Sequence, residues 1–154
     1  MDYWDKKLIR EQLDQKLKKL KPLLQLPVPE RGWIKTIRES LGMSTYDLAD
    51  RADLDQSRIS RIESAEARRE IKISTLEKIA DALGVTFVYG FVPKSTLEDL
   101  VREQARKIAL KRMNRTDHSM KLEEQGLGDD ELERALKDHI DQILVEEPAT
   151  FWSE

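Results

Sequence analysis

Five polar or basic side chains near the middle of the chain have the chemistry needed to read DNA: Gln56, Ser57, Arg58, Ser60 and Arg61. An arginine can donate two hydrogen bonds to guanine, a glutamine can bridge adenine, and a serine can bond a base or a phosphate. Ile59 and Ile62 lie among them at helical spacing, which turns the apolar side chains to one face and the polar ones to the other. This arrangement predicts a recognition helix for the major groove.

Other chemistries have few residues to draw on. The chain of 154 residues has no cysteine and 2 histidines, His118 and His139. Disulfides, thiolate metal sites and cysteine nucleophiles are therefore excluded, and most histidine chemistry is disfavoured. The sequence also lacks a glycine-rich phosphate loop, a nucleophile–base pair and a metal-ligand cluster. We expect no enzyme activity, no cofactor and no metal site.

The elements that would hold the recognition helix are short helical segments between residues 31 and 84. Gly42 ends the first, Ser44 starts the second and Asp55 starts the third, where those residue types often cap helices. The apolar spacing alone would also fit a small bundle that does not touch DNA. The agreement of caps, turn and outward polar side chains favours DNA binding.

One segment departs from the helical pattern. Residues 86–92, TFVYGFV, are β-branched and aromatic, and Pro93 follows them. This composition predicts a strand. A single strand needs a partner, which could be residues 71–73 or the same strand of a second chain.

Helices are also expected on both sides of this central region. Residues 2–21 show leucines at helical spacing and are followed by prolines at 22, 27 and 29; Ser95 and Glu98 match a capping box for a helix over 95–115. A last acidic helix is expected from Asp129 to about residue 145. The predicted fold is mainly all-α, with one or two short strands. The predicted domains are 1–29 (N-terminal helix and proline-rich connector), 31–93 (helix-turn-helix domain with the strand) and 94–154 (helical partner-binding region, acidic from 117).

Charge is distributed unevenly along the chain. Residues 1–116 hold 24 Lys and Arg against 18 Asp and Glu, whereas residues 117–154 hold 3 against 12. A basic body can approach a polyanion, and an acidic end repels one or meets a basic partner. No apolar run approaches the roughly 18 residues of a membrane span, and residues 1–10 lack a signal-peptide stretch. We expect a cytoplasmic protein with no membrane partner.

The segment LGMSTYDLADRADLDQSRISRIESAEARREIKISTLEKIADALGV resembles the Cro/repressor-type (Xre) helix-turn-helix family. Thr45 stands where many members have a phosphate-binding glutamine, and Ala65 replaces a common glycine. Repressors of this type commonly bind two half-sites as dimers, so a homodimer on double-stranded operator DNA is possible. The resemblance implies DNA contacts from Thr45, Gln56, Ser57, Arg58, Ser60 and Arg61.

A narrower resemblance covers most of the chain. The segments LDQKLKKLKPL, RGWIKTIRESLGMS, FVYGFVPKSTLEDLVREQARKIA and HSMKLEEQ match, in order, the mobile mystery protein A family. Its members look like antitoxins encoded beside a Fic/Doc-domain protein, and Fic enzymes typically transfer AMP from ATP to a protein hydroxyl. The resemblance implies a regulator that represses its own operon and restrains a Fic-domain toxin. The alternative is a stand-alone repressor of the Xre type with no toxin partner.

One short segment has a candidate inhibitory role. Inhibitors of Fic enzymes resemble Ser/Thr-x-x-x-Glu-Gly/Asn on a helix, and residues 119–123 match the first five positions, with Glu124 in the sixth. The resemblance implies that Glu123 pairs with the Fic arginine that would bind the ATP γ-phosphate. Ser119 would share its helix face. The other interpretation is an amphipathic helix with Ser119 as N-cap and Leu122 in the core.

Overall fold

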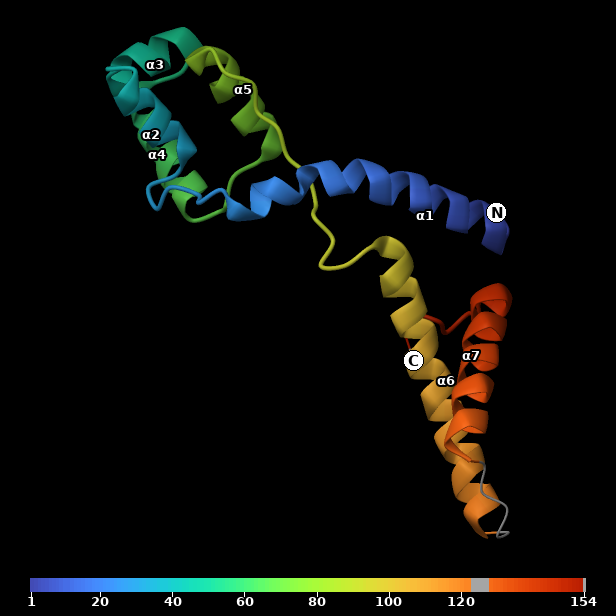
Figure 1. Cartoon of the computed structure of the whole chain (residues 1–154). Helices are drawn as coiled ribbons and strands as arrows, with labels where there is room; N and C mark the ends of the chain where they lie inside the picture. The colour runs from blue at the N-terminus through green and yellow to red at the C-terminus, as the bar shows by residue number, and fades with distance from the viewer. Residues whose placement is uncertain (123–127, 154) are drawn as a thin grey trace. The chain divides into compact units, whose positions relative to one another are not determined.

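The computed structural model describes residues 1–122 and 128–153, with the backbone alone for 116–122. The chain forms two compact units: unit 2 is Pro22–Gly90, and unit 1 joins Met1–Lys21 to Phe91–Glu154. Every regular element in these described ranges is helical, as Figure 1 shows. The elements are α1 (Tyr3–Leu17), a 3₁₀ helix (Lys18–Gln25), α2 (Trp33–Ser40), α3 (Thr45–Ala52), α4 (Gln56–Ala67), α5 (Ile73–Leu83), α6 (Leu97–Leu122) and α7 (Asp129–Glu146).

Unit 2 is a four-helix domain around one apolar core. Leu48 of α3, Ile59 of α4 and Ile79 of α5 are completely buried, and Ile34 of α2 packs against them. Full burial of such a side chain stabilises the fold by about 1.5–3 kcal/mol. Ile62 is also buried. The inward face predicted for the recognition helix is therefore confirmed.

The ends of the helices in unit 2 follow the sequence signals with one exception. Ser44 and Asp47 form a reciprocal capping box at the start of α3. Gly42 has a φ of 68°, the left-handed conformation that glycine adopts without strain. Asp55 does occupy the N-cap position of α4, but its side chain makes no capping hydrogen bond there.

The expected strand is absent. Residues 86–92 have no regular structure, and no strand occurs anywhere in the described ranges. Residues 71–73 could not serve as its partner, because Lys72 is the N-cap of α5 and Ile73 is already helical. A single extended segment needs a ladder to join, and the part of the chain that the structure describes offers none.

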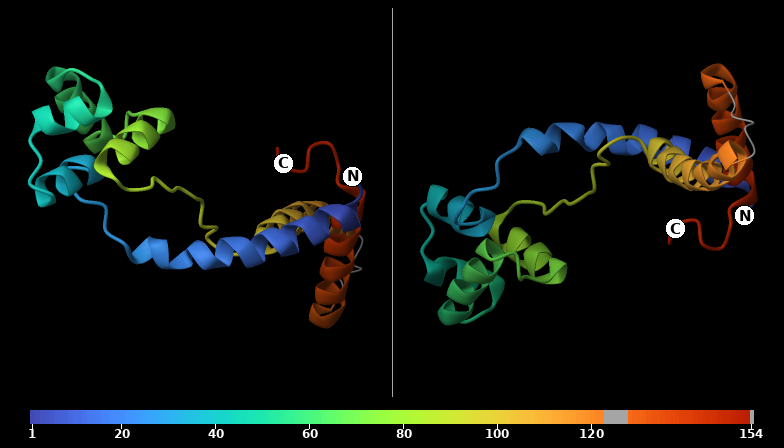
Figure 2. Two further views of the ribbon diagram at one scale, coloured as in Figure 1. Left: turned by 90° about the horizontal axis from the view of Figure 1, so that it is seen from above. Right: turned by 90° about the horizontal axis from the view of Figure 1, so that it is seen from below.

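In unit 1, α6 and α7 pack side by side (Figures 1 and 2). Their shared core includes Ile108 and Ala109 from α6, Ile143 and Leu144 from α7, and Phe151 from the segment that follows. Helix α1 joins this unit through Tyr3, which packs against the same core. Ion pairs between Arg10 and Glu98 and between Lys6 and Glu147 add to this contact.

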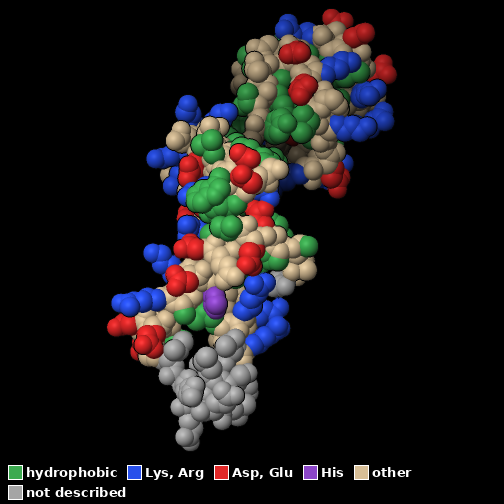
Figure 3. Space-filling view, turned by 90° about the vertical axis from the view of Figure 1, so that its right-hand side faces the viewer, with side chains coloured by type: hydrophobic (Ala, Val, Ile, Leu, Met, Phe, Trp, Pro, Cys, Tyr) green, Lys and Arg blue, Asp and Glu red, His purple; other side chains and the backbone are tan. Residues whose placement is uncertain are grey.

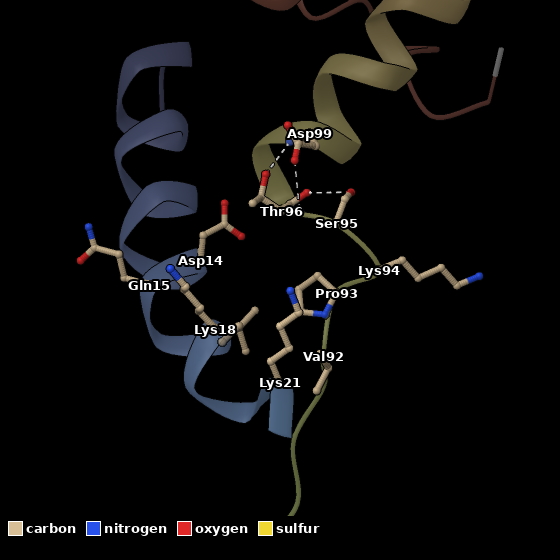
Figure 4. Close-up of a pocket in the computed structure, with 11 residues that line it drawn as sticks. Asp14, Gln15, Lys18, Lys21, Val92, Pro93, Lys94, Ser95, Thr96 and Asp99 are labelled. Carbon is tan, nitrogen blue, oxygen red and sulfur yellow. Dashed lines mark hydrogen bonds between the residues drawn. The ribbon is translucent and has the colours of Figure 1, made fainter. Parts of the chain in front are cut away.

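The start of α6 is held by two groups of hydrogen bonds between side chains and backbone N–H groups. Thr96 and Asp99 form a reciprocal capping box, drawn with dashed lines in Figure 4. The expected box of Ser95 and Glu98 is therefore displaced by one residue. Asp14 of α1 accepts the backbone N–H of Leu97 at 2.7 Å and that of Glu98 at 3.3 Å. These bonds satisfy N–H groups that a helix leaves open in its first turn.

No helix within the described ranges is long and apolar enough to cross a membrane.

Candidate nucleic-acid interface

The turn between α3 and α4 fixes how the two helices meet. Asp53 ends α3 in the left-handed conformation, with a φ of 53°. The backbone N–H of Leu54 then bonds Ala49 O at 2.9 Å, and the Leu54 side chain packs on the core of unit 2. Because the turn is short and is held by this hydrogen bond and by the packing of Leu54, the direction in which α4 leaves it is fixed.

The predicted contact residues on α4 lie on its solvent face. Ser57, Arg58, Ser60 and Arg61 are exposed, whereas Ile59 and Ile62 point into the core. Arg61 Nη2 lies 3.5 Å from Ser57 Oγ, one turn away on the same face. Among the described residues Arg58 forms no ion pair, so its guanidinium is available to a ligand.

Two of the predicted residues come together from different helices. Gln56, the first residue of α4, donates its amide Nε2–H to Thr45 Oγ1, the first residue of α3, at 3.0 Å. Both side chains are half-buried. The bond leaves the amide oxygen of Gln56 and the hydroxyl proton of Thr45 for other partners. It places the N-termini of both helices at one surface, where their dipoles favour an anion such as a phosphate.

A buried ion pair behind this surface was not predicted. Arg38 of α2 donates from Nε to Glu63 Oε1 at 2.5 Å and from Nη2 to Glu63 Oε2 at 3.2 Å. Its Nη1 donates to Met43 O at 2.8 Å, in the turn between α2 and α3. The hydrogen bond to Glu63 raises the pKa of Arg38, and burial opposes it. One arginine thus links the recognition helix, α2 and a turn.

The sequence did carry a signal for this pair. Arg38 follows Ile34 by four positions and Glu63 follows Ile59 by four, so each charged residue lies on the inward face of its helix. Two opposite charges on apolar faces are expected to pair, because a lone buried charge is costly.

A second carboxylate joins α4 to the start of α2. Glu66 accepts the backbone N–H groups of Trp33 at 2.9 Å and Ile34 at 2.8 Å. Gly32, the N-cap, has a φ of 83°, and a Cβ at that position would lie 2.7 Å from Glu66 Oε2. Glycine is therefore favoured here by its conformation, and a side chain would also displace the Glu66 carboxylate that bonds the start of α2.

The capping box of α3 lies next to Thr45. Asp47 Oδ2 accepts the hydroxyl proton and the backbone N–H of Ser44, each at 2.7 Å. The hydrogen bond from the Ser44 hydroxyl is the main cause that lowers the pKa of the Asp47 carboxyl, and the bond from the Ser44 backbone N–H lowers it further. This carboxylate is thus committed to the helix terminus.

The charge of unit 2 is nearly balanced. It holds 10 Lys and Arg against 11 Asp and Glu. Acidic and basic side chains are intermixed over the face shown in Figure 3. The net charge of unit 2 therefore adds little sequence-independent attraction to phosphates.

The other candidate residues are not placed. The side chain of Ser119 and all of Glu123 lie outside the described residues. Within the described residues, no group of three or more His, Asp or Glu side chains is arranged to hold a metal ion.

Residues 34–89 match the family model of the helix-turn-helix domain. This range contains the core, the α3–α4 turn and the exposed face of α4. The chain therefore carries an Xre-type helix-turn-helix domain, which is a DNA-binding regulatory domain and not an enzymatic one, and it is a DNA-binding transcriptional regulator. Comparisons with curated proteins and with solved structures find no match.

Proposed function

We propose that α4 enters the major groove of an operator. Gln56, Ser57, Arg58, Ser60 and Arg61 would contact bases or phosphates, and Thr45 would contact a phosphate at the start of α3. The observation that carries this proposal is the division of α4 into a locked inner face and an exposed polar face. A helix held by Ile59, Ile62 and Glu63 can present arginines to a groove without moving.

Gel-shift titrations against the protein's own promoter test this assignment. Arg58→Ala and Arg61→Ala should each weaken specific binding by about 1–3 kcal/mol if that arginine bridges a guanine. Arg68→Ala is the matched control: Arg68 is exposed and belongs to the C-terminal end of the same helix, where it pairs with Glu70. Wild-type affinity in both test variants would contradict the placement of α4 in the groove.

We further propose that the protein is an antitoxin that represses its operon and restrains a Fic-domain toxin. The resemblance to the mobile mystery protein A family supports this role, as does the acidic composition of residues 117–154. In this proposal the Glu123 carboxylate forms an ion pair with the toxin arginine that would bind the γ-phosphate of ATP. Ser119 helps to position Glu123 against that arginine. A carboxylate paired with that arginine would also repel the incoming phosphate.

Co-expression with a Fic protein encoded beside this gene provides the test. A stable complex that is silent in AMP transfer is expected, and Glu123→Gly should restore transfer while the complex stays assembled. Glu124→Gly is the control, because it keeps Glu123 and places the expected glycine in the sixth position of the motif, so AMP transfer should stay silent. Failure of any Fic protein to co-purify would favour a stand-alone repressor. Point variants are preferable to truncation at 117, since α7 and Phe151 supply much of the core of unit 1.

We also propose that the protein binds DNA as a homodimer. Two copies of α4 related by a twofold axis would reach half-sites about 34 Å apart on one side of the duplex.

A further inference from the structure

An apolar groove of about 810 Å³ lies within unit 2. Its walls come from α2, α5, the end of α4, Leu23 of the 3₁₀ helix and two irregular segments, residues 26–32 and 85–88. Six of its side chains stay 38–74% exposed although they are large and apolar: Leu23, Leu26, Val28, Trp33, Val85 and Val88. Exposed apolar surface of this extent usually marks a binding site.

One wall of the groove is a segment with unused backbone bonding capacity. Residues 86–90, here called the unpaired segment, form no backbone hydrogen bond within the described residues. The rings of Phe87 and Tyr89 stack 6.1 Å apart. Residues two apart share a side in a strand, so the local geometry suits pairing. Val88 is 74% exposed between them.

We propose that the unpaired segment pairs with the same segment of a second copy, as an antiparallel two-stranded ladder across a twofold axis. Among the described residues it has no backbone partner, and residues 72–73 belong to the start of α5. A segment that pairs with itself in antiparallel orientation produces a closed, isologous dimer. The inference deepens the proposed function, in which a dimer reads two half-sites, but it concerns assembly and does not require DNA.

The chemistry of the groove favours a second copy over a charged partner. Its charged lining residues are Glu30, Glu66 and Arg69, and Glu66 is already bonded to the backbone of α2. The remaining surface offers no pattern of charge that would select an acidic or a basic protein. The exposed apolar side chains of the second copy would instead fill it.

The available area reaches the lower end of the range for a stable dimer interface. A whole aliphatic side chain offers about 120 Å² of apolar surface and an aromatic one about 200 Å². With the exposed fractions of the six groove side chains, about 400 Å² of apolar surface is available per copy. Since about two-thirds of a homodimer interface is apolar, the two copies together would bury about 1,200 Å², where stable interfaces begin.

Light scattering of the purified full-length chain without DNA gives the first test. The wild type should be a dimer, and Val88→Glu should weaken association on the order of 100-fold or more, because a carboxylate would be buried in the interface. Val145→Glu is the matched control, since Val145 is an exposed valine on α7. It should remain dimeric. A monomeric wild type, or a Val88→Glu variant that stays dimeric, would overturn the proposal.

Crosslinking tests the pairing itself. Since the chain has no cysteine, single cysteines at positions 86–89 can be compared cleanly with Gln12→Cys on α1. A residue next to the twofold axis would face its own copy at a Cα separation of about 4.5–5.5 Å, which suits a disulfide. Each step along the strand adds about 7 Å. Disulfide formation should therefore peak sharply at one or two adjacent positions; a uniform or absent yield in a dimeric sample would refute the ladder.

The test also separates this inference from the DNA-binding proposal. Arg58→Ala should lose operator affinity and remain dimeric, whereas Val88→Glu should lose the dimer before any DNA is added.

Discussion

Replacing Glu63 by alanine tests the buried ion pair that supports the recognition helix. Arg38 is 7% exposed, and the substitution removes two of its three hydrogen bonds, leaving the one to Met43 O. Glu39 Oε1 lies 3.8 Å from Arg38 Nη2, but the Glu39 side chain is 42% exposed and is a weaker partner. Removing one member of a buried pair typically costs about 3–5 kcal/mol. A domain is usually stable by only about 5–15 kcal/mol, so unit 2 should be severely destabilised.

Urea and thermal unfolding measure this effect if unit 2 has its own signal. Trp33 lies in unit 2, whereas Trp4 and Trp152 lie in unit 1 and are 65% and 68% exposed. Both can be changed to phenylalanine so that fluorescence reports on Trp33. At about 4–8 °C per kcal/mol for a domain of this size, Glu63→Ala should lower the Tm by at least about 12 °C.

The double variant Arg38→Met, Glu63→Leu is the informative control for the ion pair. It removes both charges and fills similar volume, so it should recover most of the stability lost in Glu63→Ala. If Glu63→Ala lowered the free energy of unfolding by less than about 1 kcal/mol, the reasoning would be contradicted, because leaving a buried charge unpaired costs more than that.

Three further substitutions test the termini of the helices. Gly32→Ala should cost more stability than Gly42→Ala in thermal unfolding, because both glycines have positive φ but only Gly32 has a close neighbour, Glu66, at its Cβ position. Asp47→Asn should remove a stability increment that is present above the unfolded pKa of 3.8 and is lost as the pH falls through the lowered folded pKa; a stability difference from wild type that does not depend on pH would contradict this. Asp14→Ala should destabilise the start of α6 by about 1 kcal/mol, seen as faster amide exchange at residues 97 and 98.

The helices of unit 2 could be predicted because their signals are local. Ser44 and Gly42 cap or end helices through their own conformational preferences, and the spacing of Ile59 and Ile62 alone determines which face of α4 is buried. The outward position of Arg58 follows from the same periodicity. These features need no knowledge of the rest of the chain.

Which distant segments meet could be read from the sequence only in part. Periodicity places Arg38 and Glu63 on inward faces, but it does not say which helices meet. Asp14 gives no local sign that it caps a helix more than eighty residues later, because α1 itself does not use that carboxylate. Contacts of this kind depend on packing geometry.

The lack of a strand at residues 86–92 shows where local preference depends on assembly. β-Propensity reflects how well a side chain fits a pleated, half-buried surface, so it describes a partner as much as the segment itself. In unit 2 residues 86–90 leave Val88 and Tyr89 exposed, and no described residue pairs with their backbone. The segment therefore carries a preference that the described part of the chain does not satisfy. A second copy resolves this conflict, because it supplies hydrogen bonds and apolar cover to the same residues at once.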